Sequence, residues 1–428
     1  PGGRPAVSIE APSVAVGARV AGLDPAELTS EWGSPLYVYD ADVLRARAAA
    51  LRAALPEEAE VAFACKANSS PVVLRTLAQS GLGADVASGG ELRAVLRAGF
   101  DPARIVFTGP GKTDAELAEA LDAGVGALTI ESLEELDVVI GFSGFTRAGQ
   151  GLMLRLATEG EAEGLPIISA PGNVKFGLTD AEADEALSRL RTAGLLAPDG
   201  PYVLRGFHAF GASNVRDAAV LVQAASELAA RAEPIAARHA MTVELLDMGG
   251  GLGIPYADHE EPLDISGLGA GLAAEIHTWA ERPALRGARL LLEPGRWLSG
   301  PAGAYLCRVT RTKERGGRVV AISDGGIHHL LRPRLVGQDH RAVPAGAMAG
   351  RAVDAEVDLV GPLCTGIDIL ASAVSSPRPT AGDAYAVLDA GAYGYSESMP
   401  LFLTHPIPAE VVVSDGVVTV SRERVEPE

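Results

Sequence analysis

Residues 61–107 read VAFACKANSSPVVLRTLAQSGLGADVASGGELRAVLRAGFDPARIVF. Short apolar runs lie at 61–64, 82–86 and 104–107, and apolar residues recur every three or four positions over 71–79 and 91–98. Short apolar runs predict buried strands, whereas the 3.6-residue period predicts amphipathic helices. The stretch therefore predicts strands and helices in alternation, which is typical of a parallel β/α architecture.

The same alternation extends on both sides of this stretch. A helical pattern covers 41–54, and further helical patterns include 114–123 and 215–238. Five more strand-like runs bring the total to eight, and they lie at 127–130, 152–156, 203–207, 242–248 and 289–292. Eight β/α units over roughly 250 residues are the usual size of a closed TIM-type barrel. A doubly wound open sheet, which usually has fewer strands, is the alternative.

The pattern changes near residue 300. Strand-like runs then follow one another without a long helical pattern, at 304–312, 318–323, 352–360, 384–389, 409–413 and 417–421. Near the N-terminus, 8–10 and 36–39 also look extended. We therefore predict a β/α barrel over 37–298 and a β-sandwich or β-barrel domain formed by 1–36 and 299–428. The acidic segment 158–172 is predicted to be a long functional loop after the fifth barrel strand.

The composition excludes several classes of protein. The 428 residues include 36 basic and 55 acidic side chains, a net charge of −19, which disfavours binding to nucleic acid. No run approaches ~18 apolar residues, so no membrane span is predicted, and the start of the chain lacks a signal-peptide layout. Cys65, Cys307 and Cys364 are too few for a disulfide framework, and a reducing cytoplasm is expected.

Lys66, directly after the first predicted strand, is the sharpest candidate for catalysis. The carboxyl ends of barrel strands carry the active sites of such folds. The sequence holds only four lysines. A desolvated amine near arginines can have a lowered pKa and form a Schiff base. The alternative is a solvated lysine on the barrel rim. Lys112, after the third strand, lacks a complete phosphate-loop pattern and is interpreted as a supporting group.

Other polar or glycine-rich segments follow later strands. The triplet 249–251 could cradle a phosphate with its backbone N–H groups, with Ser213 and Arg296 as further donors, or it could be a tight turn. Glu293 could face a ring nitrogen and keep it protonated, which is useful to an electron-sink cofactor. Its alternative role is a structural pair with Arg296 or Arg155.

Five ordered motifs carry a family resemblance over about 36–413. They are FACKAN (63–68), GGGLG (249–253), EPGR (293–296), GPLC (361–364) and DAGAY (389–393). Together they resemble fold-type III pyridoxal-phosphate decarboxylases, the family of the diaminopimelate, ornithine and arginine decarboxylases. The resemblance implies an alanine-racemase-like barrel with a β domain. It also implies a homodimer with active sites at the subunit interface.

The resemblance also implies roles for individual residues. Lys66 would bind pyridoxal 5′-phosphate as a Schiff base, and Glu293 would face the pyridine nitrogen. Cys364 would reach in from the partner subunit and help to return a proton after carbon dioxide leaves. A carboxylate at the ring nitrogen, in place of an arginine, favours decarboxylation over racemisation. The phosphate would be surrounded by Gly250, Gly251, Ser213, Gly295, Arg296 and Tyr393, and Asp85, Arg155 and His208 would support Lys66 and the ring.

Several positions depart from the diaminopimelate decarboxylase pattern. Phe210 stands where a second histidine is expected, although an aromatic face could still stack on the ring. Thr365 follows Cys364 where the family carries a carboxylate for the distal ammonium of the substrate. Arg332 matches the arginine for a distal carboxylate, but Val336 replaces the tyrosine expected after it.

These departures favour a modified or carrier-tethered amino acid, such as a glutamyl group on an acyl carrier protein. A free diamino acid such as diaminopimelate is the alternative. The substrate is expected to contact Arg296, Arg332, Thr365 and Tyr393. A catalytically inactive binding protein is disfavoured because Lys66 and Cys364 are both present. His328 and His329 lack the spacing of metal ligands, and no metal is predicted.

Overall fold

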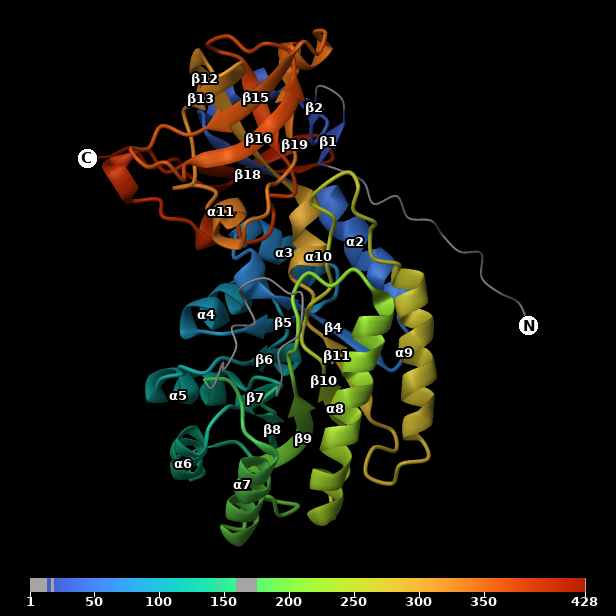
Figure 1. Cartoon of the computed structure of the whole chain (residues 1–428). Coiled ribbons are helices and arrows are strands. Elements are labelled where there is room, and N and C mark those ends of the chain that lie inside the picture. The colour runs from blue at the N-terminus through green and yellow to red at the C-terminus, as the bar shows by residue number, and fades with distance from the viewer. Residues whose placement is uncertain (1–13, 17–18, 145, 159–174, 428) are drawn as a thin grey trace.

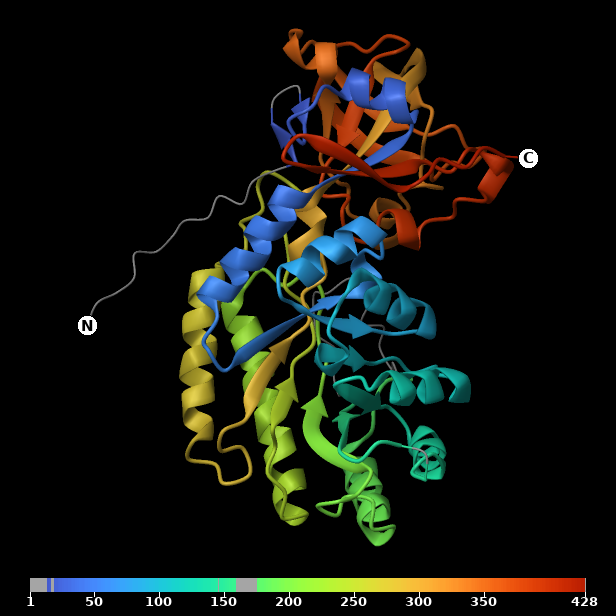
Figure 2. The same ribbon diagram turned by 180° about the vertical axis from the view of Figure 1, so that it is seen from behind.

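The computed structural model describes residues 14–16, 19–144, 146–158 and 175–427. Its elements form a β/α barrel and a mixed β unit, and the β unit lies at one end of the barrel (Figures 1 and 2). The predicted strand at 8–10 and nearly all of the predicted loop at 158–172 lie outside the described residues. No helix in the described part of the chain is long and apolar enough to cross a membrane.

The barrel is closed and consists of eight parallel strands. Their order around the barrel is β10-β11-β4-β5-β6-β7-β8-β9. The closure confirms the predicted barrel and excludes the open doubly wound sheet. The strands are β4 (Ala59–Ala64), β5 (Gly83–Val86), β6 (Ile105–Phe107), β7 (Ala127–Ile130), β8 (Gln150–Arg155), β9 (Tyr202–His208), β10 (Leu245–Asp247) and β11 (Arg289–Leu292).

Helices surround the barrel, and the apolar face of each helix packs against the barrel strands. Local signals fix where they begin. Thr113 and Glu116, for example, form a capping box at the start of α5, which satisfies backbone N–H groups that the first helical turn leaves free. The main helices are α2 (Ala41–Ala54), α3 (Pro71–Gln79), α4 (Gly89–Ala98), α5 (Asp114–Ala123), α6 (Leu133–Gly141), α7 (Asp180–Thr192), α8 (Ala218–Arg238) and α9 (Ile265–Trp279).

The β unit contains a path of seven strands, β16-β15-β13-β12-β3-β18-β19, with β17 paired to β12 and β14 paired to β17. This confirms the predicted C-terminal β domain, and the strands β14 and β16 were not anticipated. Its strands are β3 (Leu36–Asp40), β12 (Gly303–Arg315), β13 (Arg318–Ser323), β14 (Ala342–Ala345), β15 (Ala355–Val360), β16 (Ile369–Ser376), β17 (Ala384–Val387), β18 (Ala409–Ser414) and β19 (Val417–Arg422).

The N-terminal part of the chain joins the β unit through β3, which pairs with β12 and β18. A domain boundary between residues 36 and 37 would therefore cut through β3. The short strands β1 (Ala15–Val16) and β2 (Arg19–Val20) pair with each other, and α1 (Pro25–Trp32) follows them. The chain also contains two short helices, α10 (Arg296–Ser299) after the last barrel strand and α11 (Arg332–Val336) within the β unit.

The β unit meets the barrel beside Lys66. The backbone N–H of Tyr393 donates to the carbonyl of Ala67 at 2.8 Å, and the side-chain amide of Asn68 donates to the carbonyl of Gly391 at 2.8 Å. These bonds attach the 389–393 segment to the short turn of helix at Cys65–Ala67. The carboxyl ends of the barrel strands and one edge of the β unit therefore share the wall of one cleft.

Candidate active site

Lys66 lies directly after β4, on the turn of 3-10 helix at Cys65–Ala67. Its Nζ lies 2.6 Å from Oδ2 of Asp85, at the end of the neighbouring strand β5. Thr108 donates to the other oxygen of Asp85 at 2.6 Å, so the carboxylate is held from both sides. About half of the Lys66 side chain is exposed, whereas Asp85 is buried, and the amine can therefore be reached from the cleft.

The expectation of a lowered lysine pKa is wrong for this structure. Desolvation alone would lower the pKa of Lys66, but the negative charges of Asp85 and Glu293 outweigh it and raise the pKa above the ordinary lysine value. The sequence did not reveal that two carboxylates face this amine. In the ligand-free protein Lys66 is therefore an ammonium ion paired with Asp85.

Three buried polar side chains lie at the ends of three neighbouring strands, β9, β10 and β11. They are His208, Asp247 and Glu293, and their polar atoms lie within 4.8 Å of one another. His208 Nε2 lies 3.8 Å from Glu293 Oε2. Among the described residues, Oε1 of Glu293, Oδ2 of Asp247 and Nδ1 of His208 have no hydrogen-bond partner. Unpartnered buried polar atoms indicate that a ligand completes this part of the site.

Burial shifts the protonation of all three groups. Desolvation, followed by the charge of the neighbouring Asp247, raises the pKa of Glu293 well above its ordinary value. Desolvation likewise raises the pKa of Asp247 to about 7. For His208, desolvation and the positive charges of Arg155 and Lys66 lower the pKa well below 6.5. A cationic ligand group placed against Glu293 would favour its ionised form.

Glu293 does not form the structural pair that was the alternative reading of this residue. Arg296 donates instead to the hydroxyl of Tyr256 at 2.6 Å. Arg155 binds both oxygens of Glu131, at 3.0 and 2.9 Å. Glu293 is thus left free to face a ligand in the cleft.

Glycines form part of the wall of the cleft. Its wall at the glycine-rich loop is backbone, because a Cβ on Gly250 would stand 2.5 Å from the carbonyl oxygen of Glu293 and Gly251 has a φ of 94°. Only glycine allows such an approach without strain. The lining residues are Ala64, Lys66, Phe210, Ser213, Asn214, Gly250, Gly251, Leu252, Glu293, Gly295, Arg296 and Tyr393.

Most of the predicted cofactor residues thus come together. Lys66, Phe210, Ser213, Glu293 and Tyr393 line the cleft, with Gly250, Gly251, Gly295 and Arg296. Asp85 and His208 lie next to the lining residues: Asp85 contacts Lys66, and His208 contacts Glu293. Arg155 lies farther along the rim, in a polar network that reaches Asp85 through Thr108.

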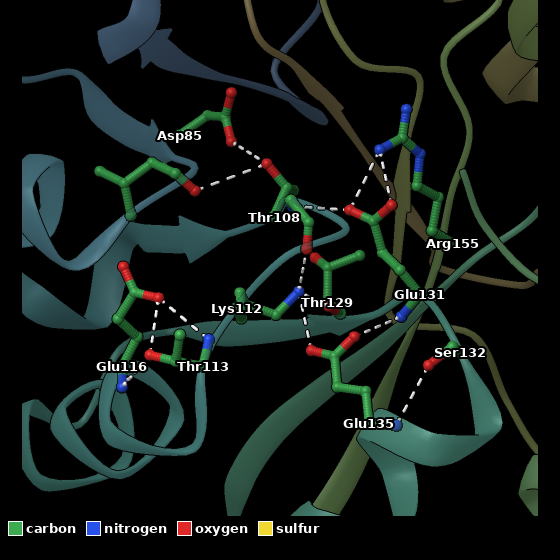
Figure 3. A network of polar contacts seen from close by, with 12 residues as sticks. Asp85, Thr108, Lys112, Thr113, Glu116, Thr129, Glu131, Ser132, Glu135 and Arg155 are labelled. Atoms are coloured by element: carbon green, nitrogen blue, oxygen red, sulfur yellow. Dashed lines mark hydrogen bonds and ion pairs between the residues drawn. The ribbon is translucent and has the colours of Figure 1, made fainter. Parts of the chain in front are cut away.

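That network surrounds Lys112 and joins the ends of β6, β7 and β8 (Figure 3). The Lys112 ammonium donates to the carbonyls of Gly109 and Thr129 at 2.6 and 2.8 Å and lies 2.8 Å from Glu135 Oε1. Its side chain is fully buried. These contacts agree with the interpretation of Lys112 as a supporting group.

Besides Asp85, His208 and Arg155, three more predicted residues do not line the cleft of this chain. Cys364 is exposed and Thr365 is partly exposed, and both lie on the 361–368 segment between β15 and β16. Arg332 is buried behind Tyr393, with its guanidinium carbon 4.9 Å from the centre of that ring. The placement of Cys364 on an outward-facing segment is compatible with a site in another subunit.

Sequence reasoning missed some residues of the site. Asp247 ends β10 directly before the glycine triplet, and a polar residue at a barrel strand end could have identified it. Glu131, which binds Arg155, directly follows β7 and could have been identified in the same way, whereas Tyr256, which binds Arg296, does not follow a strand. Their roles depend on contacts between distant segments.

A closed β/α barrel with an accessible lysine, a buried carboxylate and a glycine-walled cleft at the carboxyl ends of its strands defines an enzyme that binds an aldehyde cofactor through that lysine. The chain belongs to the pyridoxal-dependent decarboxylases. Its residues 41–300 match the family described as "Pyridoxal-dependent decarboxylase, pyridoxal binding domain".

Known proteins resemble the chain over nearly its whole length. Diaminopimelate decarboxylase of Aquifex aeolicus is 32% identical over 412 residues, covering 95% of this chain and 92% of that protein. The L-glutamyl-[BtrI acyl-carrier protein] decarboxylase of Niallia circulans is 29% identical and covers 94% of each chain. The structure of diaminopimelate decarboxylase from M. jannaschii with L-lysine aligns with a TM-score of 0.85 at 26% identity, over 95% of this chain and 93% of that one.

The chain is therefore a pyridoxal-phosphate-dependent amino acid decarboxylase, and its residues fit that cofactor. Lys66 offers the amine, the unpartnered Glu293 Oε1 can accept a hydrogen bond from a protonated ring nitrogen, and the Gly250–Gly251 backbone with Arg296 can receive the phosphate. When bound, the cofactor supplies an electron sink for the pair of electrons left by carbon dioxide.

Proposed function

We propose that this decarboxylase acts on the α-carboxylate of an amino acid that is modified or tethered to a carrier protein. The observation that carries the proposal is Thr365, a neutral residue directly after Cys364 on the 361–368 segment. A distal ammonium group would find no countercharge at that position. The similarity to the decarboxylase from Niallia circulans supports the same substrate class, and an acyl carrier protein is then a partner.

We propose specific roles for the residues of the cleft. Lys66 binds the cofactor covalently, with Asp85 as the group that faces its ammonium at 2.6 Å. Glu293 pairs with the protonated ring nitrogen, and Phe210 stacks against the ring. His208 supports Glu293 from below. The phosphate is bound by Gly250, Gly251, Ser213, Gly295, Arg296 and Tyr393, and Arg155 supports the neighbouring rim.

Cys364 is proposed to act in a homodimer. Its segment projects from the β unit and does not line the cleft of its own chain, which supports a role in the cleft of a second subunit. There the thiol would help to return a proton to Cα, and Thr365 would border the substrate. All three cysteines are free, in agreement with a cytoplasmic location.

Diaminopimelate decarboxylation is the second candidate. The similarity to diaminopimelate decarboxylases, at 32% and 34% identity for the proteins of Aquifex aeolicus and Methanothermobacter thermautotrophicus, favours it. Arg332 would then bind the distal carboxylate. This candidate requires that the guanidinium of Arg332 is free to bind the distal carboxylate of the substrate.

A comparison of substrates separates the two candidates. Carbon dioxide release is measured from free diaminopimelate, lysine, ornithine and arginine, and from a glutamyl group on an acyl carrier protein. We expect the carrier-bound substrate to turn over at least about tenfold faster, by kcat/KM, than any free diamino acid. Faster turnover of a free diamino acid contradicts the proposal for tethered substrates.

A further inference from the structure

Glu397 occupies the guanidinium of Arg332. Arg332 begins α11, and Glu397 ends a turn of 3-10 helix at Tyr395–Glu397. Arg332 Nη1 lies 3.0 Å from Oε1 and 3.2 Å from Oε2 of Glu397. The Arg332 side chain is only 5% exposed, whereas that of Glu397 is 29% exposed. Glu397 therefore engages Nη1 of Arg332 with both oxygens and is the more exposed member of the pair.

This ion pair borders the cleft through Tyr393. Tyr393 lines the cleft, and two guanidinium groups pack on its ring. The guanidinium carbon of Arg296 lies 4.8 Å from the ring centre, and that of Arg332 lies 4.9 Å from it. Arg296 lines the cleft, whereas the ion pair of Arg332 and Glu397 lies beside the Tyr393 ring and is not part of the lining.

The pair leaves a hydrogen-bond donor unused. Nε of Arg332 is buried and has no partner among the described residues. A buried N–H without an acceptor is costly, and arginine can donate to a carbonyl oxygen as well as to an anion. This donor is enclosed by protein, so a substrate group in the cleft would meet the charges of the pair and not this N–H.

Three kinds of group could end the side chain of a substrate. A carboxylate would approach Arg332 beside Glu397 and meet a like charge. An ammonium could approach Glu397, but it would then lie beside two guanidinium groups. A neutral carbonyl, as in an amide, an ester or a thioester, meets neither repulsion and can accept a hydrogen bond from Arg296, which lines the cleft.

We propose that Glu397 determines substrate specificity by cancelling the charge of Arg332, so that the cleft selects a side chain that ends in a neutral carbonyl. This inference rests on the proposed function and deepens it, because a carrier-tethered acyl group has such an end. Glu397 acts here through Arg332 as a positioning residue.

The test uses three free amino acids of similar length that differ at the distal group. L-Glutamine carries a neutral carbonyl, L-glutamate a carboxylate and L-ornithine an ammonium. The cofactor-loaded enzyme is titrated with each, and Kd is read from the change in visible absorbance. Carbon dioxide release gives kcat and KM. We expect the wild type to prefer glutamine over glutamate, and Glu397→Gln to shift this ratio toward glutamate by at least about tenfold, through Kd and KM.

Two control variants isolate the charge of Glu397. Glu281 is exposed and follows α9, and Glu281→Gln makes the same change of charge away from the cleft, so the ratio should stay unchanged. Glu397→Asp keeps the charge and should retain the wild-type preference. An unchanged ratio in Glu397→Gln, or a wild type that binds glutamate more tightly than glutamine, overturns the inference.

The two proposals fail in different ways. The proposed function is overturned if the compounds change the absorbance but neither they nor a glutamyl carrier protein release carbon dioxide. In that case the ratio of the Kd values still decides the role of Glu397. Carbon dioxide release from the carrier-bound substrate with a ratio that Glu397→Gln does not move would overturn the role of Glu397 alone.

Discussion

The two halves of the barrel rim each contain a lysine, and the two lysines differ in exposure and in the number of their partners. In the half formed by β4, β5, β10 and β11, Lys66 has one carboxylate partner and a side chain that is 48% exposed. In the half formed by β6, β7 and β8, Lys112 is fully buried and contacts two carbonyls and Glu135 (Figure 3). Only the first half leaves its amine available for chemistry.

The buried carboxylates of the two halves differ in the same way. Glu131 accepts two bonds from Arg155 and one from the backbone N–H of Gly109. Glu293 has an oxygen without a partner in the part of the chain that the structure describes, although it is equally buried. Satisfied groups hold a fold, whereas unsatisfied buried groups mark the position of a ligand. The unpartnered oxygen of Glu293 therefore agrees with its place in the lining of the cleft.

Replacing Lys66 should have the largest effect. Lys66→Ala removes the amine that binds the cofactor, and decarboxylation should fall by about 10⁴-fold or more. The visible absorbance of the bound cofactor should change at the same time. Lys313→Ala, at an exposed position on β12, serves as the matched control and should leave both unchanged. Persistence of the covalent cofactor in Lys66→Ala would contradict the division of the rim.

Lys112 should show the converse behaviour. Lys112→Met leaves Glu135 buried without its cation, and breaking a buried ion pair costs about 3–5 kcal/mol of folding stability. The variant should unfold at lower urea concentration but still bind the cofactor covalently. If it instead lost the cofactor at an unchanged urea midpoint, Lys112 would be part of the site and not of its support.

Much of the fold could be predicted because its signals are local. The eight barrel strands and their helices follow from periodicity that each segment carries by itself. The candidate site followed from residues at strand ends, such as Lys66 and Glu293. The pKa of Lys66 could not be predicted, because it depends on Asp85 and Glu293 facing the same amine.

Other features escaped prediction for a similar reason. The ion pair between Arg332 and Glu397 joins residues 65 positions apart in segments without a shared motif. Strand β3 was placed at the domain boundary, although it pairs with strands more than 260 positions away in the sequence, as Ala304↔Val38 and Val411↔Val38 show. Contacts of this kind become visible only when the chain is folded.

The same substitution, glutamate to glutamine, can be made in both halves of the rim. Glu131→Gln leaves Arg155 without its charged acceptor and should destabilise the protein by about 2 kcal/mol. Glu293→Gln removes a carboxylate whose pKa is raised by desolvation and by Asp247, so it should stabilise the ligand-free protein while lowering kcat by about 100-fold. Urea unfolding and carbon dioxide release measure the two effects. Destabilisation of similar size in both variants would contradict the assignment of the two halves.

His208 lies between the two halves and should give the smallest effect. Desolvation, followed by the charges of Arg155, Lys66 and Lys112, lowers its pKa well below 6.5, so the folded protein keeps it neutral. The unfolded chain protonates His208 as the pH falls below about 6.5, and stability is lost in that direction. Between pH 7 and pH 5.5 the contribution of this group should fall by about 1 kcal/mol.

The check is urea unfolding of the ligand-free wild type and of His208→Asn at both pH values. The wild type should lose about 1 kcal/mol more than His208→Asn over this range, because asparagine does not titrate. An equal loss in both proteins would mean that His208 titrates in the folded state as it does in the unfolded chain. Neither the burial of His208 nor the positive charges of the two halves would then lower its pKa, and the proposed division of the rim would lose the support that His208 gives it.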